Sequence, residues 1–131
     1  MFVDASAIIA MLVPETDADL IAAKLETADR LFVSPIAVWE ATVALARIRR
    51  CSIEVARLTV QRFIDAVEAQ SVDIDAAVGA SAIQAFARFG KGRHPAALNM
   101  GDCFAYASAR ALGVALLCKG DDFPQTDAVL A

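Results

Sequence analysis

Four acidic residues stand where their side chains could hold a divalent metal ion. Asp4 and Asp121 each follow a short apolar run of the strand type. Glu40 and Asp102 lie near the starts of two helical patterns. Clustered carboxylates raise one another's pKa values unless cations lie between them. Because magnesium binds oxygen ligands, usually one or two carboxylates together with substrate phosphate, the four acids predict a Mg²⁺ site.

Hydrolysis of a phosphodiester is the chemistry that such a site favours. With two ions about 4 Å apart, one activates a water and the other stabilises the leaving oxygen. The protein then needs no nucleophilic side chain. We therefore expect acids that position metal ions, and no covalent intermediate.

Each acid also has a purely structural explanation. Asp4 or Ser6 could cap the first helix, and Asp102 could favour a helix start through the macrodipole. Asp121 and Asp122 follow a Lys-Gly pair and could be turn residues.

Glu40 is harder to explain as a cap, because it interrupts a helical run that is otherwise almost entirely apolar. A salt bridge to Arg47 is the competing explanation. The two residues are seven apart, so they would meet only through the reach of the arginine side chain. We therefore favour a functional role for Glu40.

The elements that must position these acids alternate between strand and helix. Short strands are expected at 2–3, 31–33, 72–74 and 114–118, and helices at 7–13, ending at Pro14, and at 17–27, 36–50, 52–70, 76–89 and 100–112. This order predicts one α/β domain over residues 1–131, with a central short parallel sheet flanked by helices. Ligands of such sheets collect beyond the carboxyl ends of the strands, where Asp4 and Asp121 lie.

The two helices expected within residues 36–70 form a protruding pair with more apolar residues than a small sheet needs. The composition agrees, with 58% hydrophobic residues and a mean hydropathy of +0.53. We expect this surplus to serve a homodimer or a groove for an amphipathic partner helix, with additional core as the alternative.

Charge and composition exclude several other classes of protein. A net charge of -4 argues against a surface that coats nucleic acid nonspecifically. No uncharged apolar run reaches the roughly 18 residues of a membrane helix, and the amino terminus lacks a signal-peptide pattern. The three cysteines are widely spaced, which argues against a disulfide framework or a zinc knuckle. We expect a cytoplasmic protein without a membrane partner.

Three segments resemble the PIN-domain ribonucleases: Met-Phe-Val-Asp4-Ala-Ser6-Ala, Ala-Val-Trp-Glu40-Ala and Gly-Asp102-Cys-Phe-Ala-Tyr106. The longer stretches 93–106 and 117–123, with Thr-Asp at 126–127, are similar to the VapC toxins of bacterial toxin–antitoxin pairs. Together these motifs extend along the whole chain.

The resemblance implies an endoribonuclease that depends on Mg²⁺ or Mn²⁺ and cuts a structured RNA, often tRNA or rRNA. It also implies a cognate VapB-type antitoxin. Asp4, Glu40 and Asp102 match the metal-binding acids of the family, and Ser6 matches a hydroxyl that supports the first aspartate. Asp121 is the best match for the fourth acid, although Asp122 beside it could take that role.

Other residues could contact RNA. A basic cluster of Arg88, Lys91, Arg93 and His94 precedes the Asp102 helix and could follow phosphates, or it could be a solvated loop. The aromatic rings of Trp39 and Tyr106 could stack on bases. Both lie in apolar helical patterns, so we expect them in the core.

A second function class is a catalytically silent PIN-like module, in which the acids are only caps and the apolar helices bind a protein. A nuclease directed at DNA is a third, and less favoured, because no additional DNA-binding element is evident. Metal dependence separates the first two classes.

Overall fold

A four-stranded parallel sheet runs through the middle of the protein. The computed structural model describes residues 1–13 and 16–131, so Pro14 lies outside the described residues. The strands are β1 (Phe2–Val3), β2 (Phe32–Val33), β3 (Gln70–Ser71) and β4 (Leu116–Leu117), in the spatial order β3-β2-β1-β4. The helices are α1 (Ala5–Leu12), α2 (Ala18–Glu26), α3 (Pro35–Arg49), α4 (Ile53–Ala66), α5 (Ala76–Phe89) and α6 (Met100–Leu112), with a 3-10 turn at Phe123–Gln125.

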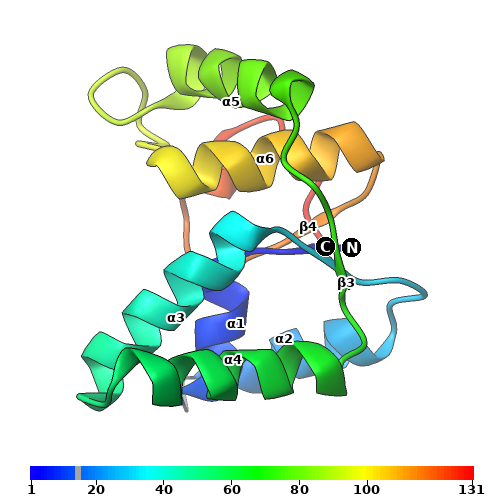
Figure 1. Ribbon diagram of the computed structural model, residues 1–131. Helices are drawn as coiled ribbons and strands as arrows, with labels where there is room; N and C mark the ends of the chain where they lie inside the picture. The colour runs from blue at the N-terminus through cyan, green and yellow to red at the C-terminus, as the bar shows by residue number, and fades with distance from the viewer. Residues whose placement is uncertain (14–15) are drawn as a thin grey trace.

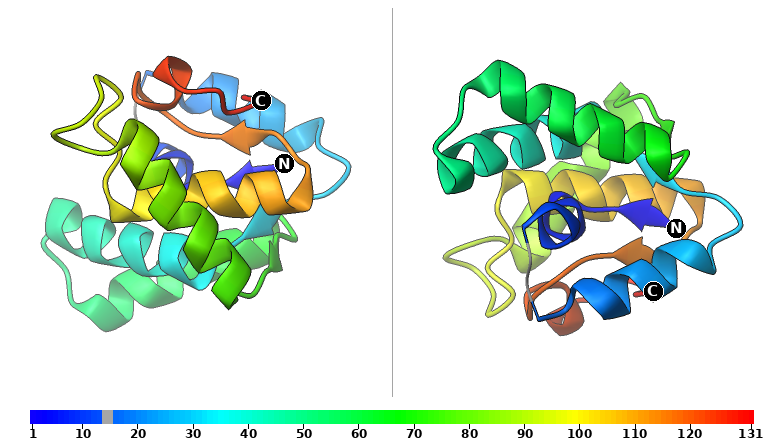
Figure 2. Two further views of the ribbon diagram at one scale, coloured as in Figure 1. Left: turned by 90° about the horizontal axis from the view of Figure 1, so that it is seen from above. Right: turned by 90° about the horizontal axis from the view of Figure 1, so that it is seen from below.

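Each buried strand contributes one side chain to either face of the sheet, because successive side chains of a strand alternate. The first residues of the three strands pack with α5 and α6, and the second residues pack with α1 to α4 (Figure 1). Seen from above, α5 lies across α6 (Figure 2). The protein therefore has two hydrophobic cores separated by the sheet, formed by Phe2, Phe32 and Leu116 on one side and Val3, Val33 and Leu117 on the other.

Local sequence signals account for most helix boundaries. The Ser34 hydroxyl caps α3 by accepting a hydrogen bond from the Ala37 amide at 3.2 Å, with Pro35 at the first helical position. Asn99 caps α6 in a capping box with Asp102. These two helices begin at, or within one residue of, the positions expected from the sequence.

The third strand differs from the expectation at 72–74. Glu68 has a φ of 53°, which helps to end α4 at Ala66, and the chain then pairs with β2 through Gln70. The amide of Val72 still donates to the Val33 carbonyl at 2.9 Å, but Val72 and Ile74 are half-buried against the α5 and α6 core. The expected helix to residue 70 is therefore too long, and the edge strand carries polar, exposed residues.

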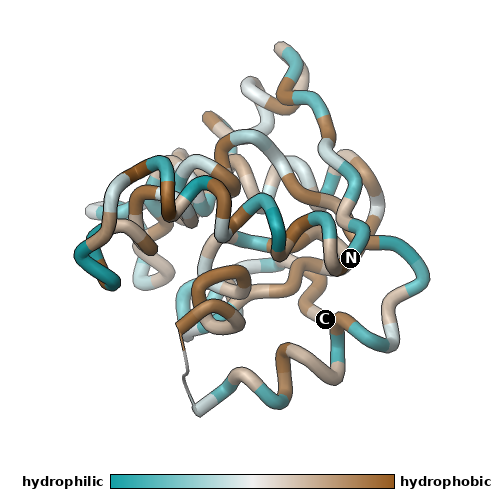
Figure 3. Tube along the Cα trace, turned by 60° about the horizontal axis from the view of Figure 1, so that its bottom comes forward, coloured by the Kyte–Doolittle hydropathy of each residue, from teal (hydrophilic) through white to brown (hydrophobic). Residues whose placement is uncertain are grey.

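The helices on one face differ in how much of their surface they bury. In Figure 3, α1 is brown along most of its length, whereas α2 alternates between brown and teal. The α3–α4 pair packs together and projects beyond the sheet, as expected (Figure 1). In residues 1–13 and 16–131, no helix is long and apolar enough to cross a membrane.

Candidate active site

The order of the strands determines where a ligand site is expected. Strand β1 has β2 on one side and β4 on the other, so the chain reverses its direction of winding between β1 and β4. Open parallel sheets bind ligands at this switch point, beyond the carboxyl ends of the strands. Asp4 directly follows β1. A groove of about 500 Å³ opens beside it, lined by Asp4, Ala5, Ser6, Ile9, Trp39, Glu40, Val43, Ala44, Arg47, Ile48, Asn99 and Asp102.

Asp4 is fixed in place by Ser6. Asp4 is only 4% exposed, and its Oδ2 accepts hydrogen bonds from the Ser6 amide at 2.9 Å and the Ser6 hydroxyl at 2.5 Å. The Lys119 amide in turn donates to the Ser6 hydroxyl at 2.9 Å. Burial raises the pKa of Asp4, and the hydrogen bonds from Ser6 oppose that rise. Ser6 thus links the acid after β1 to the segment after β4.

Glu40 reaches the groove from the second turn of α3 and lies against the first turn of α6. A Cβ atom on Gly101 would stand 2.0 Å from both carboxylate oxygens of Glu40, so any larger residue there would force this carboxylate to move. Burial, followed by the charges of Asp4 and Asp102, raises the pKa of Glu40 to about 7. Within the part of the chain that the structure describes, Glu40 forms no ion pair with Arg47. The competing salt-bridge explanation is therefore wrong.

Asp102 has a structural and an electrostatic role together. Its Oδ2 accepts a hydrogen bond from the Asn99 amide at 2.8 Å, and its own amide donates to Asn99 Oδ1 at 3.0 Å. Burial raises the pKa of Asp102 to about 6. The Asn99 hydrogen bond opposes this rise, and the charges of Asp4 and Asp122 add to it. The capping explanation is correct for Asp102, and Asp102 also belongs to the cluster of negative charge.

The two consecutive aspartates after β4 differ in their relation to the groove. Asp122 raises the pKa of Asp102, and it contributes to the rise of the Cys118 pKa to about 12, which is due mainly to burial. Asp121 contributes a backbone carbonyl that accepts a hydrogen bond from Gln125 Nε2 at 2.9 Å. The described residues that line the groove include neither aspartate. The structure therefore brings together three acids. Of the two further candidates, Asp122 is the one whose charge raises the pKa of Asp102.

The donor set of the groove fits a hydrated, hard cation. Its three acids supply carboxylate oxygens, and the charge of Asp4 raises the pKa values of both Glu40 and Asp102, which is the electrostatic situation that a cation relieves. Among residues 1–13 and 16–131, no three acidic, histidine or cysteine side chains are grouped closely enough to hold an ion together. Magnesium needs no such cage, since it keeps several waters and binds through one or two carboxylates.

The sequence is similar to that of a known family along almost its whole length. The PIN domain family model matches residues 1–129, which is nearly the whole chain. The chain belongs to the PIN-domain family. A VapC ribonuclease of Rhizobium meliloti (strain 1021) is 45% identical over 138 residues, covering 96% of this chain and 97% of the relative. Ribonuclease VapC36 of Mycobacterium tuberculosis is 39% identical over 128 residues, covering 97% and 90%.

Two solved structures share the fold of this PIN domain. The crystal structure of VapC20 of Mycobacterium tuberculosis, described as a sarcin–ricin loop cleaving toxin, has a TM-score of 0.78 at 16% identity and covers 99% of this chain and 97% of its own. A toxin–antitoxin complex from Klebsiella pneumoniae has a TM-score of 0.69 at 15% identity, covering 99% and 95%. The expected α/β fold and the resemblance to VapC proteins are confirmed.

In this PIN domain the basic residues before α6 have different partners. Arg88 pairs with Asp127 at 2.9 Å, and the Arg93 guanidinium lies over the Phe86 ring. Nδ1 of His94 accepts a hydrogen bond from the Ala96 amide at 3.1 Å. The role of Arg93 in binding substrate therefore stays a prediction, and Arg88 fastens the C-terminal tail to α5.

The two aromatic residues have opposite environments. Tyr106 is buried, as expected, and its hydroxyl donates to Asp127 Oδ1 at 2.5 Å. Trp39 is 63% exposed, so the expectation that it lies in the core is wrong. The α3 helix is apolar on most of its surface, and its periodicity does not show which face is covered.

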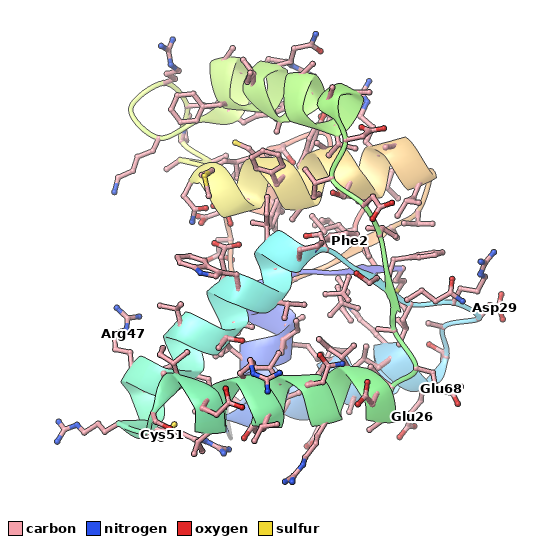
Figure 4. All side chains as sticks on the ribbon, viewed as in Figure 1. Phe2, Glu26, Asp29, Arg47, Cys51 and Glu68 are labelled. Atoms are coloured by element: carbon pink, nitrogen blue, oxygen red, sulfur yellow. The ribbon has the colours of Figure 1, made fainter. Side chains whose placement is uncertain are left out.

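One face of α3 lines the groove beyond Glu40, and the sequence analysis did not place its apolar residues there. Val43, Ala44, Arg47 and Ile48 line the groove together with Glu40. They follow Glu40 at intervals of three and four, which places them on one face of a helix. Arg47 extends outward from α3 (Figure 4). This spacing from Glu40 was the signal that could have identified them.

Proposed function

We propose that this PIN domain is a metal-dependent endoribonuclease and the toxin of a VapB–VapC pair. The observation that carries the proposal is the convergence of Asp4, Glu40 and Asp102 on one groove at the switch point of the sheet. The relatives named as VapC ribonucleases support it over almost their full length. The substrate class is RNA, with tRNA and rRNA as the first candidates, in the cytoplasm.

Asp4, Glu40 and Asp102 are the proposed Mg²⁺-binding acids, one or two of them as direct ligands and the rest through waters of the ion, and Mn²⁺ can substitute. Asp121, which is the best motif match, and Asp122, whose charge raises the pKa of Asp102, are the two candidates for the fourth acid. When bound, Mg²⁺ supplies Lewis-acid stabilisation and a more acidic water. Ser6 orients Asp4 through two hydrogen bonds to Oδ2.

The protonation state of Glu40 links the site to pH. With a pKa of about 7, its carboxyl group exchanges a proton with solvent near neutral pH. Only the deprotonated carboxylate has both oxygens available as acceptors for a cation. Gly101 has no Cβ atom to displace these oxygens, so the Glu40 carboxylate lies against the α6 backbone and lines the groove.

A cleavage assay tests the proposed activity. Purified protein is incubated with total tRNA and rRNA in Mg²⁺, in Mn²⁺ and in a chelator, and the ends of the products are determined. We expect cleavage only with metal, leaving 5′-phosphate and 3′-hydroxyl ends, and none from the Asp4→Ala variant. A wild-type protein that cuts no RNA with either metal, and an Asp4→Ala form that is equally toxic on expression, would contradict the proposal.

The silent-module alternative has some support, because Asp4 and Asp102 do cap their helices. Thermal melting with and without Mg²⁺ distinguishes the two functions. A ligand that binds only the folded state raises the melting temperature, whereas acids that are only caps produce no shift.

Exposed apolar side chains support the proposed protein partners. Ile53, Val55 and Leu58 of α4 are exposed, as are Ile83 and Met100 near a hollow of about 240 Å³ between α5 and α6. We propose a homodimer in solution and a VapB-type antitoxin bound to the α3–α4 pair. Sedimentation of the protein alone, and of the protein mixed with the antitoxin from the neighbouring gene, tests both assemblies.

A further inference from the structure

An exposed tryptophan stands at the edge of the acidic groove. Trp39 is 63% exposed, although tryptophan side chains are on average highly buried. It lines the same groove as Asp4, Glu40 and Asp102. The residue that follows it in α3 is Glu40, and although successive side chains of a helix point about 100° apart, both line this groove. The same helix therefore brings an aromatic ring and a carboxylate to one groove.

The groove wall next to Trp39 is apolar. Ile9 of α1 and Val43 and Ile48 of α3 line it, and the two α3 residues are 39% and 44% exposed. Phosphate chemistry alone does not need such a wall. A ligand with a charged edge and a flat apolar face would use both sides of the groove, and a nucleotide has this combination in its phosphate and its base.

On the basis of the endoribonuclease function proposed above, we propose that Trp39 is a base-stacking subsite. A nucleobase next to the phosphodiester at the acids lies on the indole ring. Stacking on an aromatic ring tolerates any base, because every base has a π-face. A paired base is covered by its neighbours in the helix, so the subsite selects an unpaired nucleotide in a loop, bulge or end.

Arg47 adds a positive charge to the groove that holds Trp39. It lines the groove two helical turns after Trp39, so a cation and an aromatic face lie at opposite ends of the α3 wall. Grooves that bind single-stranded nucleic acid combine positive charge along the backbone with aromatic stacking. The charge is local, as the net charge of -4 requires.

The fluorescence of Trp39 measures the contact directly, because the chain has one tryptophan. The Asp102→Asn variant, which we expect to be inactive, is titrated in Mg²⁺ with a single-stranded oligoribonucleotide of about ten nucleotides. We expect saturable quenching, which a sugar–phosphate oligomer without bases and an RNA duplex do not produce. RNA that binds by anisotropy without changing the tryptophan emission would overturn the proposal.

Substitutions of Trp39 separate stacking from apolar contact. Trp39→Leu retains apolar surface without a π-face, and Trp39→Phe retains the π-face. Loss of one stacked base costs about tenfold in affinity, so KM for single-stranded RNA rises about tenfold in Trp39→Leu and Trp39→Ala. It rises less in Trp39→Phe, and kcat at saturation changes little in all three. Leu20→Ala, at an exposed apolar residue of α2 outside the groove, is the control.

The outcomes distinguish this subsite from the function on which it rests. A wild-type protein that cleaves RNA, with a Trp39→Ala form of equal KM, removes the subsite and leaves the nuclease. A protein that shows quenching by RNA but no cleavage with any metal retains the subsite and loses the nuclease. Emission that shifts with the antitoxin and not with RNA would assign Trp39 to a protein interface and overturn the subsite.

Discussion

The α-carbon of Gly101 lies against the carboxylate of Glu40, so closely that a methyl group there would stand 2.0 Å from both oxygens. This contact joins α6 to α3 at the point where the groove needs both helices. Gly101→Ala must displace the Glu40 carboxylate. A displacement of about 1 Å can cost about 100-fold in rate, so we expect a loss of this order in RNA cleavage with the fold retained.

Gly79→Ala is the matched control, since Gly79 is also a helical glycine. Within the described residues, a Cβ atom on Gly79 meets nothing within 4 Å. Alanine in a helix is more stable than glycine by about 0.5–1 kcal/mol. We expect Gly79→Ala to keep full activity and to melt at a slightly higher temperature. Equal activity in the two variants would contradict the role of the Gly101 contact.

The raised pKa values predict how the stability of the metal-free protein depends on pH. Glu40 titrates near pH 7 and Asp102 near pH 6 in the folded state, against ordinary values of 4.5 and 3.8. Between these values the folded state binds more protons than the unfolded state, so the free energy of unfolding falls as pH rises. We expect the melting temperature in a chelator to fall from about pH 4 to about pH 7.

Glu40→Gln tests the assignment of this pH dependence. The variant removes the group with the higher pKa and one charge from the cluster. Its melting temperature should fall less steeply over the same interval and should exceed that of the wild type at the alkaline end. Added Mg²⁺ should stabilise the wild type more at the alkaline end than at the acidic end. A wild-type slope that is unchanged in Glu40→Gln would show that other groups cause it.

Asp121 and Asp122 differ in their expected contribution to activity. Asp122 raises the pKa of Asp102, so Asp122→Asn should lower that pKa and shift the acidic limb of the pH–rate profile to lower pH. We also expect activity to fall by at least about tenfold, as for a lost charge at a metal site. Asp121→Asn, one residue away, should leave the limb unchanged. Carboxyl titration by NMR measures the shift in the absence of substrate, and the reverse result would assign the role to Asp121.

Ser6 should affect activity more than its contribution to stability suggests. Ser6→Ala removes the hydroxyl that donates to Asp4 and accepts from Lys119, at a cost of about 1–2 kcal/mol in the free energy of unfolding. Asp4 then keeps the hydrogen bond from the Ser6 amide but loses the one from the hydroxyl, so its carboxylate is held less firmly and we expect about a tenfold loss of activity in the folded protein. Ser34→Ala loses a helix cap of similar value, about 1 kcal/mol, without touching an acid. Equal activity per folded molecule in both variants would contradict the positioning role.

The fold could be predicted from the sequence where chemical signals were local. Asp75 and the Gly90 stop delimit α5, and Asn99 starts α6 at the expected residue. Strand β3 was misplaced because an exposed edge strand has no need of apolar residues, so Gln70 and Ser71 gave no hydrophobic pattern.

Part of the candidate site could also be predicted from the sequence. Asp4, Glu40 and Asp102 follow strands or begin helices, and the topology alone brings those positions to one edge. Trp39 could not be placed, because periodicity does not show which side of an apolar helix remains uncovered. Nor could Asp121 be distinguished from Asp122, since that depends on the backbone after Gly120, which has a φ of +97°.

The sheet divides the molecule into two separately packed cores, and the groove lies on the seam between them. Glu40 belongs to a helix of one core and Asp102 to a helix of the other. The distance between the Glu40 and Asp102 carboxylates therefore depends on how the two halves of the molecule pack against each other. Substitutions deep in either half, such as at Val60 or Phe89, can change the turnover of a folded protein without touching an acid. Because core substitutions also lower stability, a mutational survey of this PIN domain should compare activity per folded molecule, and we expect it to find losses at such remote interior positions.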